Sequence, residues 1–216
     1  MVCYNEALAV SFTIGGVRVN KHGVKSMKEI KGKHIVHQSL DFSCGAAGLS
    51  TIFNYYLGDP VSEKEIISTI FRSVDMKKVQ ERRGFSLLDL KKFAEAKGYK
   101  VTGYKMDPEY LAGLKKPVLV PIKFKNYQHF VIVKGVIGDR VFLSDPAVGN
   151  MTMKISRFEG IWLGGIGLVI EHSGEEGREY YAMTQAQDEA IFADYKNALR
   201  TLQGTVFRTA IFVNEY

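Results

Sequence analysis

The chain has 216 residues, 46% of them hydrophobic and 24% charged, and its formal net charge is +6. This composition is typical of a globular protein and excludes a disordered chain, a collagen-like repeat and a coiled coil. The basic residues gather in runs at 25–33 and 77–83 without any zinc-ligand spacing or aromatic RNA-binding pattern. They therefore favour an acidic peptide or an anionic surface over nucleic acid as a partner. No stretch provides the ~20 consecutive apolar residues of a membrane-spanning helix, so we expect no membrane span.

Residues 1–34 are expected to form an N-terminal extension that contains a β-hairpin. Two short apolar and β-branched runs, 12–14 and 17–19, flank the pair Gly15-Gly16, which suits a two-residue turn. Upstream, Ala7-Leu8-Ala9 has the small-x-small form of a signal-peptidase site, although residues 1–6 lack a cationic start and an apolar core. The tripeptide is either the remnant of an export signal or a chance match. The compartment thus remains open between periplasmic or otherwise extracytoplasmic and cytoplasmic.

Helices are predicted in the first half of a main domain that spans residues 35–171. One begins at Cys44 and continues to residue 57, where Gly58-Asp59-Pro60 ends it. Ser-x-x-Glu at 62–65 and Ser-x-x-Asp at 86–89 have the spacing of capping boxes, which predicts helices that end near residues 71 and 97. The intervening segment 72–84 is charged and predicts an irregular surface loop near the functional site.

The second half of the main domain has the pattern of β-strands. Runs rich in β-branched and aromatic residues predict strands at Val118–Phe124, His129–Ile137, Arg140–Leu143 and Ile166–Glu171. Helices followed by an antiparallel sheet define an α+β fold, with the N-terminal helices packed on the sheet. Residues 172–216 form a C-terminal extension in which an apolar stripe, Ile191, Tyr195, Ala198 and Leu202, predicts an amphipathic helix. That helix either docks on its own domain or binds a second copy or a partner.

Cys44 is the strongest candidate for a reactive residue. The chain has only two cysteines, Cys3 and Cys44, so it has no disulfide framework, and it lacks Cys-x-x-Cys, His-Glu-x-x-His and phosphate-loop motifs. We therefore expect neither a metal nor a cofactor. A cysteine at a helix start lies among unpaired N–H groups that carry partial positive charge, which favours the thiolate. A lone cysteine in this position is also compatible with an inert buried thiol, so its partners decide between the two.

Three further side chains complete a candidate site. His129 begins an apolar strand next to a polar loop, where a general base can reach a cleft from a rigid backbone. If Gly138-Asp139 closes a hairpin, its two strands return Asp145 to the neighbourhood of His129, where a carboxylate can orient the imidazole. Gln38 lies six residues before Cys44, and its amide can donate to the oxyanion of a tetrahedral intermediate.

The sequence resembles a known family at these residues. The strings HQSLDFSCGAA at 37–47, QHFVIV at 128–133 and LSDP at 143–146 are similar to the bacteriocin-processing, double-glycine cysteine peptidases of the papain-like clan. The resemblance extends over about residues 35–171 and implies a papain-like fold. Among these proteins it is greatest to the free-standing peptidases of functional-amyloid (Fap) export operons, which favours an extracytoplasmic location. The extension at 172–216 has no counterpart in this comparison.

The resemblance implies a function and roles for the four residues. Cys44 is then the nucleophile, His129 the general base, Asp145 the acid that orients it and Gln38 the oxyanion donor. The implied substrate is a peptide or protein cleaved after a Gly-Gly pair that ends a leader peptide, in association with secretion or export machinery. Two alternatives remain: a module on the same fold that binds a leader or export substrate without cleaving it, and acyl transfer at the same site.

Overall fold

The computed structural model describes residues 10–14, 17–21, 31–114, 116–124 and 127–172. The predicted N-terminal hairpin is confirmed, because β1 (Val10–Ile14) pairs antiparallel with β2 (Val17–Lys21) and Ile14 lies opposite Val17. The tripeptide at 7–9, Cys3 and the predicted C-terminal helix lie outside the described residues. Within the described ranges, no helix is long and apolar enough to cross a bilayer.

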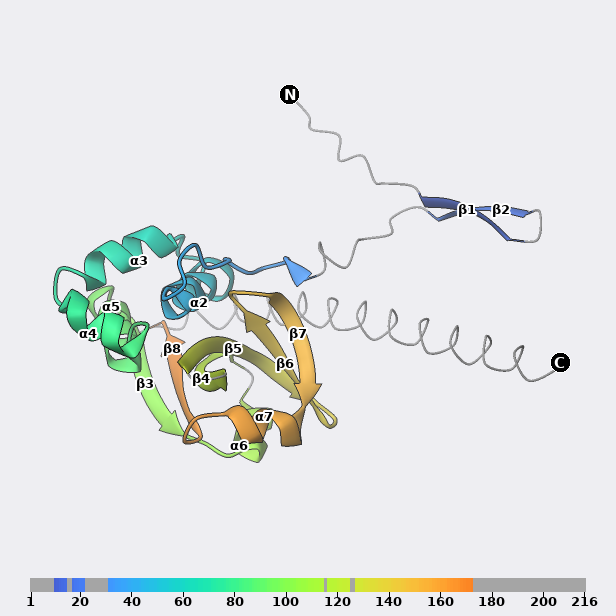
Figure 1. The fold of residues 1–216 in the computed structure, drawn as a ribbon. Coiled ribbons are helices and arrows are strands. Elements are labelled where there is room, and N and C mark those ends of the chain that lie inside the picture. The colour runs from blue at the N-terminus through green and yellow to red at the C-terminus, as the bar shows by residue number, and fades with distance from the viewer. Residues whose placement is uncertain (1–9, 15–16, 22–30, 115, 125–126, 173–216) are drawn as a thin grey trace, which may run out of the picture.

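A six-stranded antiparallel sheet forms the centre of the main domain, in the order β3-β8-β4-β5-β6-β7 (Figure 1). Four strands match predictions: β4 (Val118–Phe124), β5 (Tyr127–Ile137), β6 (Arg140–Asp145) and β8 (Ile166–Glu171). The two outermost strands, β3 (Lys100–Lys105) and β7 (Gly149–Lys154), were not predicted. Edge strands bury fewer side chains than central ones, so their apolar pattern is weak; β3 buries only Val101.

The central strands are buried on both faces. On β4, β5 and β8, alternate residues enter two separate apolar clusters: Leu119, Ile132 and Leu168 belong to one, and Val120, Val131 and Val169 to the other. Because successive strand side chains point to opposite faces, this alternation places one cluster on each face of the sheet. The near-continuous apolar runs that predicted these strands thus reflect burial from both sides.

Helices cover the two faces unequally. The first cluster contains residues from α2 (Cys44–Ile52), the π-helix η1 (Phe53–Leu57), α3 (Glu63–Ile70), α4 (Met76–Arg82) and α5 (Leu87–Ala96). The second contains Leu111 of α6 (Pro108–Gly113) and Phe158 of α7 (Ile155–Ile161), two short helices that were not predicted. In Figure 1 the larger helical group lies on the opposite side of the sheet from α6 and α7. The α+β class and the packing of N-terminal helices on an antiparallel sheet are confirmed.

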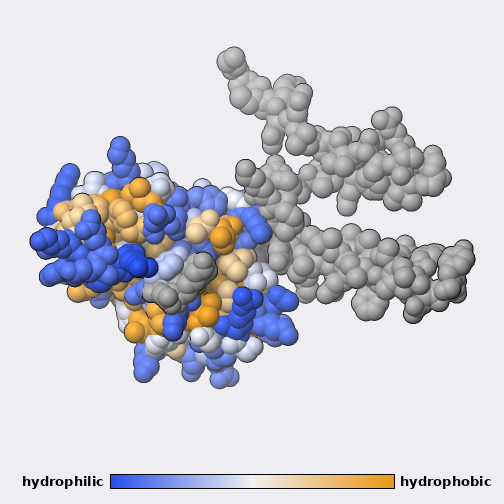
Figure 2. Space-filling model, in the orientation of Figure 1, coloured by the Kyte–Doolittle hydropathy of each residue, from blue (hydrophilic) through white to orange (hydrophobic). Residues whose placement is uncertain are grey.

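The prediction of an irregular loop at residues 72–84 was wrong, because this segment contains α4. Asp75 caps the helix by accepting a hydrogen bond from the Lys77 N–H, and Val79 is buried in the first apolar cluster. A single buried residue in seven is too weak an apolar pattern to indicate a helix, and the tertiary contact of Val79 decides the structure. Around the helical side of the molecule, hydrophobic and hydrophilic surfaces lie next to each other (Figure 2).

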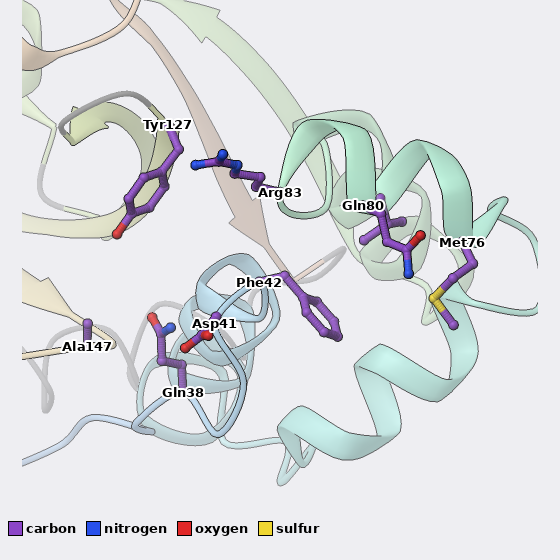
Figure 3. Close-up of a pocket in the computed structure, with 9 residues that line it drawn as sticks. Gln38, Asp41, Phe42, Met76, Gln80, Arg83, Tyr127 and Ala147 are labelled. Atoms are coloured by element: carbon purple, nitrogen blue, oxygen red, sulfur yellow. The ribbon is translucent and has the colours of Figure 1, made fainter.

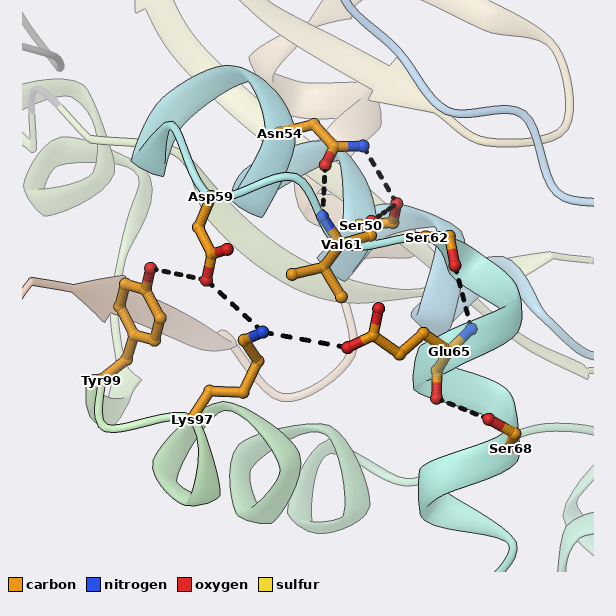
Figure 4. A network of polar contacts seen from close by, with 9 residues as sticks. All are labelled: Ser50, Asn54, Asp59, Val61, Ser62, Glu65, Ser68, Lys97 and Tyr99. Carbon is orange, nitrogen blue, oxygen red and sulfur yellow. Dashed lines mark hydrogen bonds and ion pairs between the residues drawn. The ribbon is translucent and has the colours of Figure 1, made fainter.

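The caps of α3 and α5 differ in detail. Ser86 and Asp89 form a full reciprocal capping box. At α3, Ser62 Oγ accepts from the Glu65 N–H, but the Glu65 carboxylate extends toward Lys97, at 3.9 Å, and Lys97 also pairs with Asp59 (Figure 4). These contacts join α3, the turn after η1 and the end of α5.

Candidate functional site

Cys44 is the first residue of α2, as predicted. The preceding Ser43 is fully buried, and its Oγ accepts from the Leu40 N–H, which fixes the chain where it enters the helix. The first turn of α2 contains no acidic side chain to offset the positive end of the helix dipole. Cys44 is a free thiol, 3% exposed as a whole residue, and it lines a small pocket.

Small residues let α2 approach the sheet closely. A Cβ added to Gly48 would come within 2.8 Å of Leu119 on β4, and one added to Gly45 within 3.1 Å of Phe130 on β5. Side chains larger than hydrogen at these two positions would therefore push the helix away from the strands. The sequence string Cys44 to Gly48 thus brings the sulfur to the end of β5 that carries His129.

The backbone register of β5 and β6 brings His129 and Asp145 together. Val133 lies opposite Leu143, and because side chains alternate along a strand, His129 and Asp145 share the face of this pair. His129 Nε2 lies 2.8 Å from Asp145 Oδ1, and both residues are buried. The predicted return of Asp145 to His129 through the β5–β6 hairpin is confirmed.

A short turn holds the carboxylate of Asp145. Asp145 Oδ1 also accepts the backbone N–H of Ala147, at 2.8 Å. A carboxylate that accepts two hydrogen bonds is fixed in direction. It can therefore orient the imidazole ring of His129 and stabilise a positive charge on it.

His129 has a strongly raised pKa. Burial lowers it, but the hydrogen bond with Asp145, then a hydrogen bond with the side chain of Cys44, and the charges of both partners outweigh burial and raise the pKa from 6.5 to about 9. Since Nε2 faces Asp145, the second ring nitrogen, Nδ1, remains for the sulfur. The structure thus brings sulfur, imidazole and carboxylate into one hydrogen-bonded chain that favours the imidazolium.

Gln38 lies in the loop that leads to Cys44. Its backbone N–H donates to the Pro146 carbonyl at 2.9 Å, and its Nε2 donates to the Leu40 carbonyl at 2.9 Å. An amide group carries two hydrogens, so one remains for another acceptor. Gln38 lines the large pocket described next, and its role as an oxyanion donor stays a prediction.

A large pocket of about 690 Å³ has Gln38 in its lining (Figure 3). The loop before α2 provides one wall, α4 and the residue after it provide another, and Tyr127 of β5 points in between. Arg83, at the end of α4, extends its side chain toward Tyr127. The lining residues are Gln38, Asp41, Phe42, Met76, Val79, Gln80, Arg83, Tyr127 and Ala147.

Sequence reasoning missed Tyr127 as a member of this site. Its ring packs edge-on to that of His129, with 6.4 Å between ring centroids and an interplanar angle of 81°. Burial, followed by the charges of Cys44, Asp145 and Asp41, raises the pKa of Tyr127. The signal was available, because Tyr127 lies two residues before His129 and must share its face of the strand.

A second, smaller pocket lies directly at Cys44. Its volume is about 100 Å³, and it is bordered by Gly84, Phe85 and Phe130 among other residues. Gly84 belongs to the segment between α4 and α5 and approaches the Phe42 carbonyl closely, since a Cβ there would lie 3.3 Å from that oxygen. The space beside the sulfur is therefore narrow. Among the described residues, no group of three or more His, Cys, Asp or Glu side chains is arranged to hold a metal.

Comparisons with known proteins agree with this geometry. A model of the family described as "Peptidase C39 family" matches residues 32–175. The "Probable functional amyloid protease FapD" of Pseudomonas aeruginosa is 34% identical over 163 residues, which cover 76% of this chain and 71% of that protein. The "Lactococcin-G-processing and transport ATP-binding protein LagD" of Lactococcus lactis subsp. lactis is 28% identical over 137 residues, 61% of this chain but 18% of that protein.

A solved structure shares the fold. The crystallised peptidase domain of Streptococcus ComA, described as a bi-functional ABC transporter involved in a quorum-sensing pathway, superimposes with a TM-score of 0.56 at 22% identity. The match covers 64% of this chain and 98% of that domain. The helices and the six-stranded antiparallel sheet therefore have the papain-like arrangement that the sequence predicted.

Proposed function

The chain belongs to the peptidase C39 family of cysteine peptidases, and from this premise we propose that it cleaves leader peptides after a Gly-Gly pair in proteins destined for export. The observation that carries the proposal is the hydrogen-bonded chain of Cys44, His129 and Asp145 at the start of α2. The relatives support the substrate class, because one is named as a probable functional amyloid protease and another as a lactococcin-G-processing and transport protein. Action outside the cytoplasm is part of the proposal.

The proposed reaction begins once the Cys44 proton has passed to His129, which gives the thiolate–imidazolium pair that the raised pKa of His129 favours. The thiolate attacks the carbonyl carbon after the second glycine, and the carbonyl oxygen becomes an oxyanion. The Cys44 backbone N–H, which has no acceptor within its own helix, and the free amide hydrogen of Gln38 stabilise that charge. His129 then protonates the leaving amine as the C–N bond breaks, which leaves a thioester on Cys44.

Water resolves the thioester in the second half of the reaction. His129, now neutral, removes a proton from the water, and the resulting hydroxide attacks the thioester carbonyl. The C–S bond breaks, the leader departs as a carboxylic acid, and the proton on His129 returns to the sulfur. Asp145 remains ionised throughout and stabilises each imidazolium that forms. Resolution by water distinguishes this proposal from acyl transfer, in which an amine attacks.

The two pockets support selection of a small residue and a long peptide. The narrow pocket at Cys44, about 100 Å³ and bordered by the ring of Phe85, has room for little more than a glycine backbone. The large pocket, about 690 Å³, can hold a leader segment and presents both apolar side chains and the charge of Arg83. We propose that sterics in the first pocket select glycine and that the second pocket binds the leader.

The test uses a synthetic leader that ends in Gly-Gly, joined to a short cargo peptide. The wild-type protein is expected to release the cargo after the second glycine, as measured by mass spectrometry, and a substrate with Val in place of either glycine is expected to remain intact. Cys44→Ala is expected to abolish cleavage with an unchanged circular dichroism spectrum, whereas Cys3→Ala, the matched control, keeps full activity. Cleavage by Cys44→Ala would exclude the proposal.

A thiol-labelling experiment separates cleavage from simple binding. Iodoacetamide at neutral pH is expected to alkylate Cys44 rapidly in the wild type and slowly in His129→Ala, because the imidazolium stabilises the reactive thiolate. Peptide mapping identifies the labelled cysteine. An unreactive Cys44 in a protein that still binds the leader would favour the non-cleaving module.

A further inference from the structure

Glu63 is a buried carboxylate outside the set of residues that contact the pocket. It is the first residue of α3 and is 8% exposed. Both of its oxygens are used: Oε1 accepts the Ser39 backbone N–H at 2.9 Å, and Oε2 accepts the Ser39 hydroxyl at 2.7 Å. Ser39 directly follows Gln38 in the chain.

The segment that Glu63 holds is otherwise a surface loop. Ser39, Leu40 and Asp41 are exposed, so water could satisfy their polar groups without help from the protein. Burying a carboxylate costs free energy even when it is hydrogen-bonded, and the structure records no ion pair for Glu63 among the described residues. A buried charge in this position is therefore better explained by the geometry that it imposes on the loop than by the stability of the loop.

The geometry concerns the amide of Gln38. On one side of Gln38 its own N–H donates to the Pro146 carbonyl, next to Asp145. On the other side Glu63 holds Ser39 through two bonds. These two contacts fix the backbone on both sides of Gln38, and the side-chain amide in addition donates to the Leu40 carbonyl, one residue after Ser39. Glu63 lies in the first turn of α3, whose rigid backbone fixes where its side chain begins.

We propose that Glu63 is a positioning residue that holds the Gln38 amide at the cleft through Ser39. This inference rests on the proposed function, in which Gln38 donates to the oxyanion. It predicts that removing Glu63 affects the transition state more than substrate binding, because the oxyanion forms only after attack.

A double-mutant cycle tests this coupling. Glu63→Ala is expected to lower kcat for the Gly-Gly peptide about tenfold with little change in KM, because both bonds to Ser39 are lost, and Ser39→Ala about threefold, because the bond from the backbone N–H remains. In a Gln38→Ala background, Glu63→Ala is expected to change kcat less than twofold. If Glu63→Ala instead lowered kcat by the same factor with and without Gln38→Ala, the proposal would be overturned. Glu65→Ala, on the same helix turn but exposed, is the matched control and should leave kcat unchanged.

A spectroscopic measurement makes the test independent of activity and of folding defects. In ¹⁵N NMR spectra, Glu63→Ala, which removes both bonds to Ser39, is expected to shift or broaden the side-chain amide signals of Gln38 and to leave those of Gln80, on the opposite wall of the pocket, in place. Unchanged Gln38 signals would overturn the positioning role even if the enzyme proves inactive on Gly-Gly peptides. Failure of the proposed function would instead appear as cleavage by Cys44→Ala or as no cleavage by the wild type.

Discussion

His129 and Asp145 are held by the backbone pairing of two adjacent strands, whereas Gln38 and Arg83 are held by individual side-chain and helix-end contacts. The pairing of β5 with β6 ends at Ile132 and Ser144, next to the site, and beyond it His129 pairs with β4 and Asp145 with β7. Backbone pairing on both sides, and not a single side chain, therefore determines where the imidazole meets the carboxylate. Gln38 depends on Ser39 and Pro146, and Arg83 depends on the short helix α4. We call His129 and Asp145 the sheet side of the site, and Gln38 and Arg83 the loop side. Substitutions are expected to reduce activity strongly on the sheet side and moderately on the loop side.

The largest effect is expected from removing the imidazole on the sheet side. His129→Ala leaves Cys44 without a proton acceptor, so kcat/KM for the Gly-Gly peptide should fall about a thousandfold or more. Thermal unfolding should show a folded protein, because the β5–β6 pairing does not need the side chain. His172→Ala is the matched control, since His172 contacts the Leu57 carbonyl away from this group. A loss of less than tenfold in His129→Ala would argue against its role as the base.

The next effect is expected from separating α2 from the sheet. Gly48→Val places methyl groups against Leu119, where even a Cβ comes within 2.8 Å, and should lower the free energy of unfolding by about 1–3 kcal/mol. Because α2 also carries Cys44, activity should fall more than stability alone explains. Gly103→Ala, on the exposed edge strand with no atom within 4 Å of the added Cβ, should change neither. Equal activity of Gly48→Val and wild type, measured on folded protein, would show that the sulfur does not depend on this packing.

The same contrast explains how much of the site was predictable from sequence. His129 and Asp145 were predicted to meet because period-two patterning and the turn at residues 138–139 together specify a hairpin, and a hairpin determines which side chains are neighbours. Cys44 was predicted at a helix start from the small residues after it. In each case the residues of one short segment are enough to predict where the side chain lies.

Contacts between distant segments have no such pattern. Glu63 is separated from Ser39 by 24 residues, and only the folded chain shows that its two oxygens face that loop. The helix α4 was missed because one buried valine stabilises it, and β7 because it contains the polar residues Asn150 and Thr152 and forms only by pairing with β6. Tertiary contacts therefore decided the structures that local patterns did not indicate.

The raised pKa of His129 predicts a pH dependence of both stability and activity. Because the folded protein binds this proton more tightly than the unfolded chain, the stabilisation is complete below pH 6.5 and is lost as the pH rises through about 9. The difference in unfolding free energy between wild type and Asp145→Asn should thus be largest below pH 6.5 and shrink toward pH 9. In parallel, the alkaline fall of kcat/KM should lie near pH 9 in the wild type and at lower pH in Asp145→Asn. An alkaline limb that does not move would contradict the assigned cause.

The smallest effect is expected on the loop side, at Arg83. This residue has a φ of 56°, a left-handed conformation in which glycine is favoured, yet it has a long cationic side chain that points into the large pocket. We expect that the backbone strain is tolerated because the Arg83 side chain binds the leader peptide. Arg83→Gly should then remove the strain and raise the stability slightly, and KM for the leader peptide should increase several-fold at constant kcat. Arg72→Gly, exposed and outside the pocket lining, should leave KM unchanged. An unchanged KM in Arg83→Gly would mean that leader binding uses the apolar wall of the pocket alone. A fall in kcat would instead mean that the end of α4 also positions the reacting groups. The catalytic residues on the strands and the binding residues on the loop and α4 could then not be treated as separate.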